Sequence, residues 1–509
     1  MWWSKSKVSS ISSPLPCLCL LWLIVPACEA QQQDLGALLT AKCNSWNTKT
    51  TLSFPGDGSF ANVTERWTVF APPMYSAAIS PATEEDVVKT VKLAAKYNIS
   101  FLATGAGHGY GTTLGKLQNG LDIDLSQFKS ISVNQSAGTV TVGGGVRMRD
   151  VIDAVFKAGF EIQTGSCSCP GFVGATIGAG VGRWSGIFGL IIDALVSVRL
   201  VTADGRIVQV SKTSNPDLFW AIRGAGANFG IITSATYRLH KIVAGANGGG
   251  QVMNADILVP ANMSAAYFNA LQSFSGKMPA NLAAVSIVRY DADAGAAGIL
   301  ANWDYMGSEA DGRRAMAPIL ALNPPVVSIS TVPWNKLFAT AGFGIDPVLC
   351  ENNVIRDLYS ANVRNLSAST MQAAFNKMGT FYSDHPEARG SVLELETFPN
   401  QAATSVPDGE TAYPWRDALG NMIFLFSWDA STNSATSTAA TKLGRQLRDD
   451  FVKTSGYPDL SVYVSYAHGD EKIEQIYGRN KLPRLAALKK SWDPRNVFAY
   501  NNALPTKYP

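Results

Sequence analysis

Three clusters of closely spaced glycines constrain this chain more than any other feature of its sequence. They lie at 105–111, 178–182 and 224–230. Glycine lets backbone N–H groups approach a phosphate with no Cβ in the way, so each cluster is a candidate nucleotide-binding loop. None has the G-x-G-x-x-G spacing of a dinucleotide-binding strand-to-helix turn, and none is followed by the lysine of a Walker loop. The sequence therefore predicts a cradle of another type.

The apolar pattern around these loops alternates between helix and strand. Residues 84–96 have helical spacing, and the short strand 101–104 leads directly into the first glycine loop. Two strands at 195–202 and 206–210 flank an Asp-Gly turn, which predicts a hairpin. A helix is predicted to start at Pro216. Together these segments predict one α+β unit rich in glycine loops.

A run of small residues at 244–250 predicts a domain boundary. Beyond it, strands at 284–290, 392–398 and 422–428 and helices at 368–378 and 438–454 predict a second α+β domain. The tail is expected to contain an aromatic strand near 463–466 and a helix near 481–490. The predicted units are a signal peptide (1–30), an N-terminal segment (31–66), the glycine-rich domain (67–242), the second domain (243–460) and a C-terminal segment (461–509).

The N-terminus predicts entry into the secretory pathway. Lys5 and Lys7 precede an apolar stretch at 15–27, and Ala30 ends a small-residue cleavage site. That stretch is shorter than the roughly 20 residues that span a bilayer, so we expect no membrane span after cleavage. The mature protein is expected to be extracellular or vesicular and glycosylated. The sequons are Asn62, Asn98, Asn134, Asn262 and Asn365.

Charge and composition indicate a small-molecule partner. The chain of 509 residues has 42 Lys and Arg against 39 Asp and Glu, and it contains no long basic run, which argues against nucleic acid. Four scattered histidines and the absence of a Cys-x-x-Cys pair argue against a metal site. Hydrophobic residues make up 46% of the chain, enough for a sizeable core.

Four motifs, in this order, resemble those of the berberine-bridge-enzyme-like FAD-linked oxidoreductases of the vanillyl alcohol oxidase / p-cresol methylhydroxylase superfamily. The resemblance covers residues 67–240 and 462–504 and is of the fungal, secondary-metabolite type. It implies an α+β flavoprotein in which a substrate domain is inserted into an FAD-binding domain. The motifs are Thr104-Gly-Ala-Gly-His-Gly-Tyr110, Gly165-Ser-Cys-Ser-Cys-Pro-Gly171 with Gly174, Asn215-Pro-Asp-Leu-Phe-Trp-Ala-Ile-Arg-Gly224, and Tyr477-Gly with Trp492-Asp-Pro-Arg-Asn-Val-Phe498.

The resemblance also implies covalently bound FAD. In many members a histidine bonds the 8α-methyl group of the flavin, and a cysteine bonds its C6 atom. His108 matches the histidine, and the family spacing falls on Cys167, with Cys169 as the alternative. Gly178, Gly180 and Gly182 are expected to line the pyrophosphate. The other residues expected to bind FAD are Thr104, Gly105, Ala106, Gly107, Gly109, Tyr110, Gly165, Gly171, Gly174, Ile231 and Asn501.

Four cysteines remain after signal removal. With Cys167 assigned to the flavin, and Cys169 too close to it for easy bridging, a disulfide between Cys43 and Cys350 is expected in an oxidising compartment.

The substrate's proton needs an acceptor with a tuned pKa. Tyr466 is the first candidate, followed by Tyr463. Glu394 and Glu396 alternate on a predicted strand and therefore share one face, which is either a solvated face or a base site. His468 either assists or lies in an exposed loop.

The leading hypothesis is a secreted oxidase that transfers hydride from a small organic molecule, a secondary-metabolite intermediate, to FAD. Dioxygen then reoxidises the flavin and gives hydrogen peroxide. One alternative is a carbohydrate oxidase, in which Trp415, Trp428 and Tyr413 would supply aromatic platforms for sugars. The other is a flavoprotein that binds its ligand without turnover.

Overall fold

A small, mainly parallel sheet carries the first glycine loop. The computed structural model describes residues 34–243, 247–429 and 434–509, so the predicted signal peptide lies outside it. The strands are β1 (Thr51–Ser53), β2 (Tyr75–Ser80), β3 (Phe101–Thr104) and β4 (Gly120–Asp124), in the order β1-β2-β4-β3. Because β1 pairs with β2, the N-terminal segment is part of this sheet.

The helix α3 (Glu84–Tyr97) packs on this sheet and has the limits that its sequence predicts. The side chain of Thr83 accepts a hydrogen bond from the backbone N–H of Asp86, and three acidic residues occupy the first turn. Asn98 ends the helix in the left-handed conformation.

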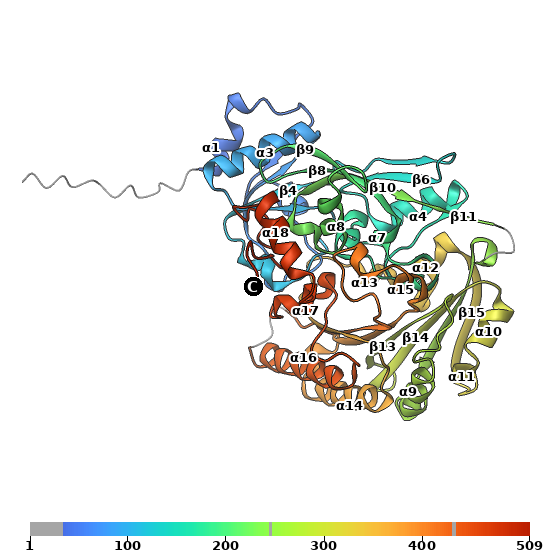
Figure 1. Ribbon diagram of the computed structural model, residues 1–509. Coiled ribbons are helices and arrows are strands. Elements are labelled where there is room, and N and C mark those ends of the chain that lie inside the picture. Colours follow the sequence, from blue (N-terminus) through green and yellow to red (C-terminus); the bar gives the residue numbers. More distant parts are fainter. Residues whose placement is uncertain (1–33, 244–246, 430–433) are drawn as a thin grey trace, which may run out of the picture.

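A second, five-stranded antiparallel sheet completes the glycine-rich part (Figure 1). Its order is β5-β6-β10-β8-β9, and β8 and β9 form the predicted hairpin. The helix α8 starts at Pro216, as predicted. The elements are β5 (Ile131–Asn134), β6 (Thr139–Gly143), α4 (Met148–Lys157), α5 (Phe172–Gly178), β8 (Leu195–Val201), β9 (Ile207–Ser211), α8 (Pro216–Ala225) and β10 (Ile231–Arg238).

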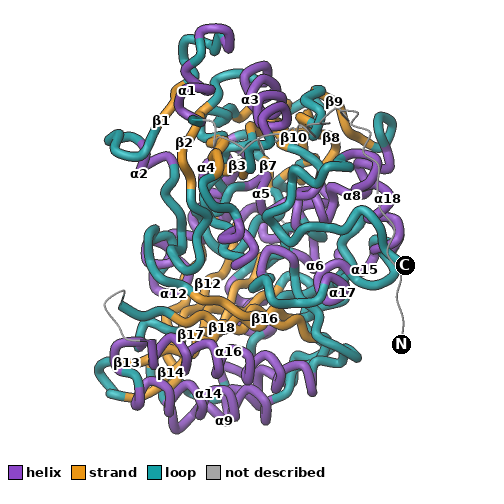
Figure 2. Tube along the Cα trace, turned by 90° about the vertical axis from the view of Figure 1, so that its left-hand side faces the viewer, coloured by secondary structure: helices purple, strands orange, loops and turns teal. Residues whose placement is uncertain are grey.

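The second part is a seven-stranded antiparallel sheet in the order β15-β12-β14-β13-β17-β18-β16. Figure 2 shows α9, α14 and α16 on the side of this sheet that faces away from the glycine-rich part. The other face is therefore turned toward the glycine loops. The elements are β12 (Gln251–Val259), α9 (Ser264–Gln272), β13 (Leu282–Asp291), β14 (Ala296–Met306), β15 (Val326–Pro333), β16 (Asp357–Val363), α14 (Ala368–Asp384), β17 (Val392–Thr397), β18 (Gly420–Phe426) and α16 (Ser434–Thr454).

Shorter elements connect the two parts and fill their edges. They are α1 (Leu35–Thr40), α2 (Phe60–Val63), β7 (Phe160–Glu161), α6 (Ser185–Phe188), α7 (Ile191–Ala194), β11 (His240–Lys241), α10 (Glu309–Ala315), α11 (Ala317–Leu320), α12 (Leu337–Gly344), α13 (Asp346–Leu349) and α15 (Gln401–Ser405).

The C-terminal segment returns to the glycine-rich part through α17 (Ile473–Tyr477) and α18 (Leu482–Trp492), which packs on α8. The Lys489 ammonium is fully buried; it bonds the Asp493 carboxylate at 2.6 Å and the carbonyl oxygens of Asn228 and Phe498. The same carboxylate accepts from the N–H of Phe498. The Trp492–Phe498 motif therefore anchors the tail through one buried ion pair.

The predicted strand at 463–466 is wrong. Residues Val464–Tyr466 form a single 3-10 turn, in which the Tyr466 N–H donates to the Tyr463 carbonyl. Side chains satisfy the backbone that a neighbouring strand would otherwise pair: Ser360 donates to the carbonyl oxygen of Tyr466. The two aromatic residues of this segment, Tyr463 and Tyr466, pack on each other with ring centroids 4.8 Å apart.

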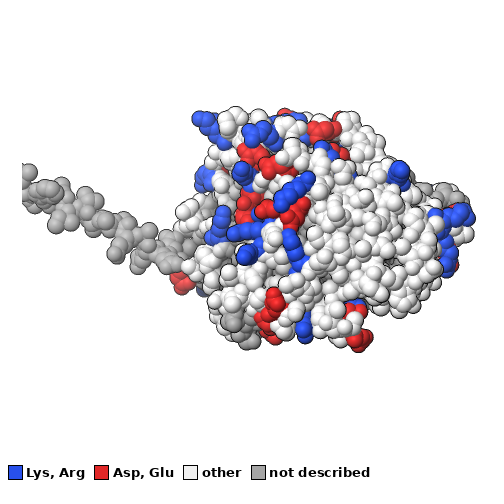
Figure 3. All heavy atoms as spheres, turned by 90° about the horizontal axis from the view of Figure 1, so that it is seen from below, with Lys and Arg blue, Asp and Glu red and all other residues white. Residues whose placement is uncertain are grey.

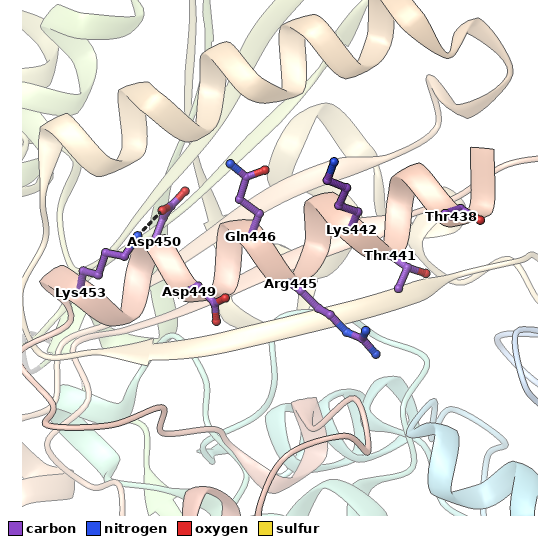
Figure 4. Close-up of a pocket in the computed structure, with 8 residues that line it drawn as sticks. All are labelled: Thr438, Thr441, Lys442, Arg445, Gln446, Asp449, Asp450 and Lys453. Atoms are coloured by element: carbon purple, nitrogen blue, oxygen red, sulfur yellow. Dashed lines mark hydrogen bonds and ion pairs between the residues drawn. The ribbon is translucent and has the colours of Figure 1, made fainter. Parts of the chain in front are cut away.

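The outer face of α16 carries charges of both signs (Figure 4). Lys453 pairs with Asp450, one turn earlier on the helix, at 2.9 Å. Figure 3 shows basic and acidic side chains interleaved in one area of this side of the molecule and a largely uncharged remainder. Among the described residues, no helix has the length and apolar character needed to cross a membrane.

Replacing Lys489 by Met should lower the free energy of unfolding by about 3–5 kcal/mol, because the Asp493 carboxylate would be left buried and unpaired. Arg484→Met on the same helix is the matched control. Its pair with Asp217 is exposed, so the loss should stay within about 1 kcal/mol. Equal losses in chemical denaturation would contradict the assigned role of the buried pair.

Candidate active site

A cavity of about 620 Å³ lies where the seven-stranded sheet faces the glycine loops. Its wall takes residues from both parts and from the C-terminal segment. Of the residues predicted to bind FAD, all but Gly178, Gly180 and Gly182 line it: Thr104, Gly105, Ala106, Gly107, His108, Gly109, Tyr110, Gly165, Cys167, Gly171, Gly174, Ile231 and Asn501. The three candidate catalytic residues, Tyr466, Tyr463 and Glu396, line it too.

The histidine loop leaves the end of β3 in a fixed path. The Thr104 hydroxyl donates to the buried Asp122 carboxylate at 2.7 Å. Gly107 has φ +68°, and a Cβ there would lie 2.6 Å from the carbonyl oxygen of Glu65, so no other residue fits. The Nε2 atom of His108 is buried and has no hydrogen-bond partner among the described residues. Burial, followed by the charge of Arg356, lowers the pKa of His108 to about 3.

The cysteine loop brings a thiol to that imidazole. The Cys167 sulfur lies within 4.8 Å of a ring nitrogen of His108. Burial, with smaller contributions from Asp346, Glu394 and Glu396, raises the pKa of Cys167, so the thiol stays protonated.

The predicted disulfide between Cys43 and Cys350 is wrong, because Cys350 is bonded to Cys169. Segment 346–350 lies over the cysteine loop, where the Ser168 N–H donates to the Asp346 carboxylate at 2.9 Å. Cys43 is exposed and free. The alternative that Cys169 bonds the flavin is incompatible with this disulfide. The bond also removes one ligand from the His-Cys-Cys grouping at 108, 167 and 169, whose spacing is otherwise that of a metal site.

The glycines at 178–182 face other parts of the chain instead of the cavity. A Cβ on Gly182 would lie 1.8 Å from the carbonyl oxygen of Thr164, and one on Gly178 would meet the Ser465 hydroxyl. Gly180 has φ +75° and packs against Ile191. These glycines allow close approach of protein to protein, a role that a loop pattern alone does not distinguish from phosphate binding.

Strand register explains the cavity's substrate-facing wall. Cross-strand neighbours form rows over the sheet, and alternate residues of each strand share the face. In the second of two such rows, Glu394 lies directly between Ile287 and Ile423. One row is Asp256, Asn302, Val285, Glu396, Asn421 and Asn362; the next is Leu258, Leu300, Ile287, Glu394, Ile423 and Ser360.

The two glutamates share a face, as predicted, and it is a buried one. Burial raises the pKa of both carboxyl groups. The charge of Glu394 raises the pKa of Glu396 further, so Glu396 holds its proton to the higher pH. The Ser166 hydroxyl donates to Glu396 Oε1 at 2.7 Å, whereas Oε2 is buried and unpartnered among the described residues.

Three tyrosines surround this acid pair, and they differ in what their hydroxyl groups do. Tyr463 is committed to the backbone, accepting from the Gly180 N–H and donating to the Ala175 carbonyl. Tyr466 lies beside Glu396 and lowers the pKa of that carboxyl group. The hydroxyl of Tyr110 is buried and has no hydrogen-bond partner among the described residues. Burial raises the pKa of Tyr110 and Tyr466, so both hydroxyls stay protonated.

Other predicted site residues lie elsewhere. His468 is neither in an exposed loop nor part of the cavity wall: it is buried, stacked on Tyr359 at 4.1 Å. The expected sugar platforms are also absent from the wall that the described residues form. Tyr413 packs on Tyr463, Trp415 on Tyr457, and Trp428 on Phe70.

The sequence pattern carries no sign of several residues that shape the cavity. Arg183 lines it and pairs with the buried Asp304 at 2.6 Å. The wall at 338–354 and the residues Arg66, Trp67 and Arg356 come from segments that carry no motif. These segments are brought together by contacts between residues distant in the sequence, such as the isolated parallel bridge between Thr68 and Val354.

Comparison with known proteins agrees with this architecture. The FAD binding domain family matches residues 75–211, and the berberine and berberine-like family matches 462–505. FAD-linked oxidoreductase srdI of Neurospora crassa is 48% identical over 484 residues, covering 95% of each chain. The chain belongs to the berberine-bridge-like FAD-linked oxidoreductases.

Solved structures share the whole fold. Wild-type BBE-like 1 of Physcomitrella patens superposes with a TM-score of 0.78 at 25% identity, covering 91% of this chain and 98% of the other. The glucooligosaccharide oxidase of Acremonium strictum, described with a 6-S-cysteinyl, 8α-N1-histidyl FAD, has a TM-score of 0.77 at 22% identity and covers 90% and 98%. This berberine-bridge-like chain is therefore an α+β two-domain flavoprotein.

The cavity fits FAD on its own chemistry. Its lining includes the first glycine loop, residues 498–502, Gly144 and Gly230. The buried, unpartnered Nε2 of His108 shows that the site needs a further group beside this ring. FAD, when bound, supplies a two-electron acceptor.

Peptide mapping without reduction should recover Cys169 joined to Cys350. Cys43 should react with iodoacetamide in the folded protein because it is exposed. Cys350→Ser should cost about 2–5 kcal/mol of stability, whereas the matched Cys43→Ser should cost little. Recovery of a Cys43–Cys350 peptide would overturn the assignment.

Proposed function

We propose that the protein is a secreted oxidase that uses covalently bound FAD to oxidise an apolar alcohol, of the kind made in secondary metabolism, to the carbonyl compound. The observation that carries this is the cavity in which His108 and Cys167 face Glu396 and Tyr466. The substrate carbon loses a hydride and the hydroxyl loses a proton. Dioxygen finally receives two electrons and two protons in all and becomes hydrogen peroxide.

Glu396 is the proton acceptor in this proposal, and Tyr466 orients the substrate hydroxyl. The free Oε2 atom of Glu396 is a buried acceptor at the cavity wall. The raised pKa makes the carboxylate of Glu396 a stronger base than that of an ordinary glutamate, at pH values high enough to ionise it. Tyr463 cannot serve in this way because its hydroxyl is bonded to the backbone on both sides.

The aliphatic sheet face favours an apolar substrate over a carbohydrate. The wall facing the substrate includes Leu300, Ile287, Ile423, Val392 and Leu425 around Glu394, while Glu396 and Asn302 lie in the neighbouring row. Sugar pockets combine aromatic platforms with several polar groups. The tryptophans that could have formed such platforms pack elsewhere.

Covalent attachment is proposed through His108 and Cys167. At each link, one C–H of the flavin and the N–H or S–H of the protein are replaced by a C–N or C–S bond. The two electrons and two protons released at each link reduce dioxygen to hydrogen peroxide. The spacing of the two side chains, within 4.8 Å, suits two substituents of the same ring.

Entry into the secretory pathway is part of the proposal. The five sequon asparagines are all exposed among the described residues, and Cys169 and Cys350 form a disulfide typical of an oxidising compartment.

Purified protein should release hydrogen peroxide from aromatic or allylic primary alcohols faster than from oligosaccharides.

Glu396→Gln should lower kcat/KM by about 10²–10⁴-fold. Only the ionised carboxylate accepts a proton, so wild-type activity should fall as pH drops through the raised pKa of Glu396, well above the ordinary value of about 4.3. Glu394→Gln is the matched control: it should keep this proton transfer but move the fall in activity to lower pH, because the charge of Glu394 raises the pKa of Glu396. Undiminished peroxide release by Glu396→Gln would contradict the assignment.

Acid-precipitated wild-type protein should remain yellow. Cys167→Ala should keep the colour through the histidine link alone, and His108→Ala with Cys167→Ala should release all flavin to the supernatant. Cys43→Ala, which removes the exposed thiol, is the control. Mass spectrometry of the peptides checks which side chain carries the flavin, and an adduct on neither peptide would refute covalent attachment.

A further inference from the structure

His108 is the first layer of a three-layer stack. The Trp67 indole lies against the imidazole at 4.5 Å, with the two planes 18° apart. The Arg356 guanidinium lies over the Trp67 ring at 4.3 Å. The three residues come from the first glycine loop, the start of the glycine-rich part before β2, and the segment before β16.

The middle layer is fixed by hydrogen bonds to both parts of the molecule. The Trp67 N–H donates to the carbonyl of Gly107, beside His108. Its indole Nε1 donates to the Leu349 carbonyl at 2.8 Å. Arg66 donates to the carbonyl oxygen of Gly109 at 2.7 Å, on the other side of the histidine. The indole therefore has one position relative to the imidazole.

The outer layer is a cation that forms no ion pair with a described carboxylate. Arg356 is buried, and its guanidinium donates to the carbonyl oxygens of Trp67 and Glu351. The Glu351 charge acts on it without pairing, and burial lowers the pKa of Arg356. A buried cation that lacks an ion pair disfavours a second positive charge nearby.

Two further cations near His108 act in the same direction, whereas a hydrogen bond to the backbone of His108 itself raises the pKa of the imidazole. The acidic groups Asp346, Glu394 and Glu396 act on the neighbouring Cys167. Arg147 and Arg66 are also cations, and each lowers the pKa of the imidazole. The neighbouring Cys167 is a protonated thiol, so it supplies no negative charge. The surroundings of the ring therefore favour its neutral form.

A second stack in the same molecule provides the contrast. His468 lies on Tyr359 at 4.1 Å, and the Arg448 guanidinium lies over that ring at 5.5 Å. There, Arg448 pairs with Asp470 and Glu471, and Asp357 lies 3.4 Å from the histidine. The layering is the same, but carboxylates surround it. A stacked arginine can therefore form ion pairs with carboxylates, as Arg448 does, so the absence of such pairs at Arg356 is specific to the stack at His108.

We propose that Trp67 and Arg356 are positioning residues for His108, which fix the plane of its ring and hold it uncharged, with a free nitrogen lone pair, for bonding to FAD. This rests on the proposed attachment through His108. A protonated imidazole has no lone pair to form the new C–N bond, so a neutral ring is required. Neither residue touches the substrate in this role; both act through the histidine.

The test uses the full chain in a Cys167→Ala background, where His108 is the remaining link. Protein is incubated with FAD in air at about pH 5.5 and about pH 8, and the flavin-bearing His108 peptide is quantified by mass. The parent should react equally at both pH values, because its low pKa keeps the ring neutral. Arg356→Met and Trp67→Ala should react more slowly at about pH 5.5, by roughly threefold up to a limit of about tenfold for an ordinary histidine.

Conservative variants and a matched control complete the design. Arg356→Lys and Trp67→Phe should restore the parent's pH profile, and they remain informative if the larger changes fail to fold. Arg448→Met disturbs the second stack and should leave attachment unchanged. Equal attachment by Arg356→Met at both pH values, or a pH-dependent loss in Arg448→Met, would overturn the proposal.

Carbethoxylation of His108 separates this proposal from the attachment itself. The reagent modifies neutral imidazole, so its rate against pH reads the protonation of His108 without flavin. A midpoint near the ordinary histidine value of about 6.5 in the parent would overturn the positioning role. A low midpoint with no flavin adduct would support the role of the stack and overturn attachment alone.

Discussion

The site depends on closing a cavity between the glycine loops of one part and the side chains of the facing sheet. The glycine-rich part supplies the first, because its loops bring backbone close to the cavity. The seven-stranded sheet supplies the second, because one face of a strand presents every other residue. The C-terminal segment, anchored by the buried Lys489–Asp493 pair, then places Tyr466 against the acid pair. The site is therefore complete only when the glycine-rich part, the seven-stranded sheet and the C-terminal segment have packed together.

Charges of opposite sign line the cavity. Arg356, Arg66 and Arg147 act on His108, whereas Glu394 and Glu396 lie on the facing sheet. Water screens little in such a place, so each charge shifts its neighbours strongly. The arginines keep a histidine neutral, and the charge of Glu394 makes Glu396 more basic. The same cavity therefore contains the uncharged imidazole of His108, which can act as a nucleophile, and the carboxyl group of Glu396, which can act as a base once it is ionised.

The sequence predicted local elements and the loops that carry the cofactor, but not the contacts between distant segments. The strand before His108, the hairpin at 195–210 and the helix at Pro216 follow from periodicity and turn chemistry. The shared face of Glu394 and Glu396 follows from the two-residue repeat of a strand. The Cys169–Cys350 bond and the Trp67 stack could not be predicted this way, because their partners are brought together by tertiary packing across 181 and 41 to 289 residues of chain.

The wrong disulfide shows what a count of cysteines leaves out. Elimination pairs Cys43 with Cys350 only because the other two thiols are neighbours in the sequence. In the fold, segment 346–350 covers the cysteine loop, and the Asp346 carboxylate already holds the backbone of Ser168. The disulfide then joins the loop that carries Cys167 to the wall of the substrate cavity. The disulfide therefore ties the loop that carries Cys167 to the segment that covers it.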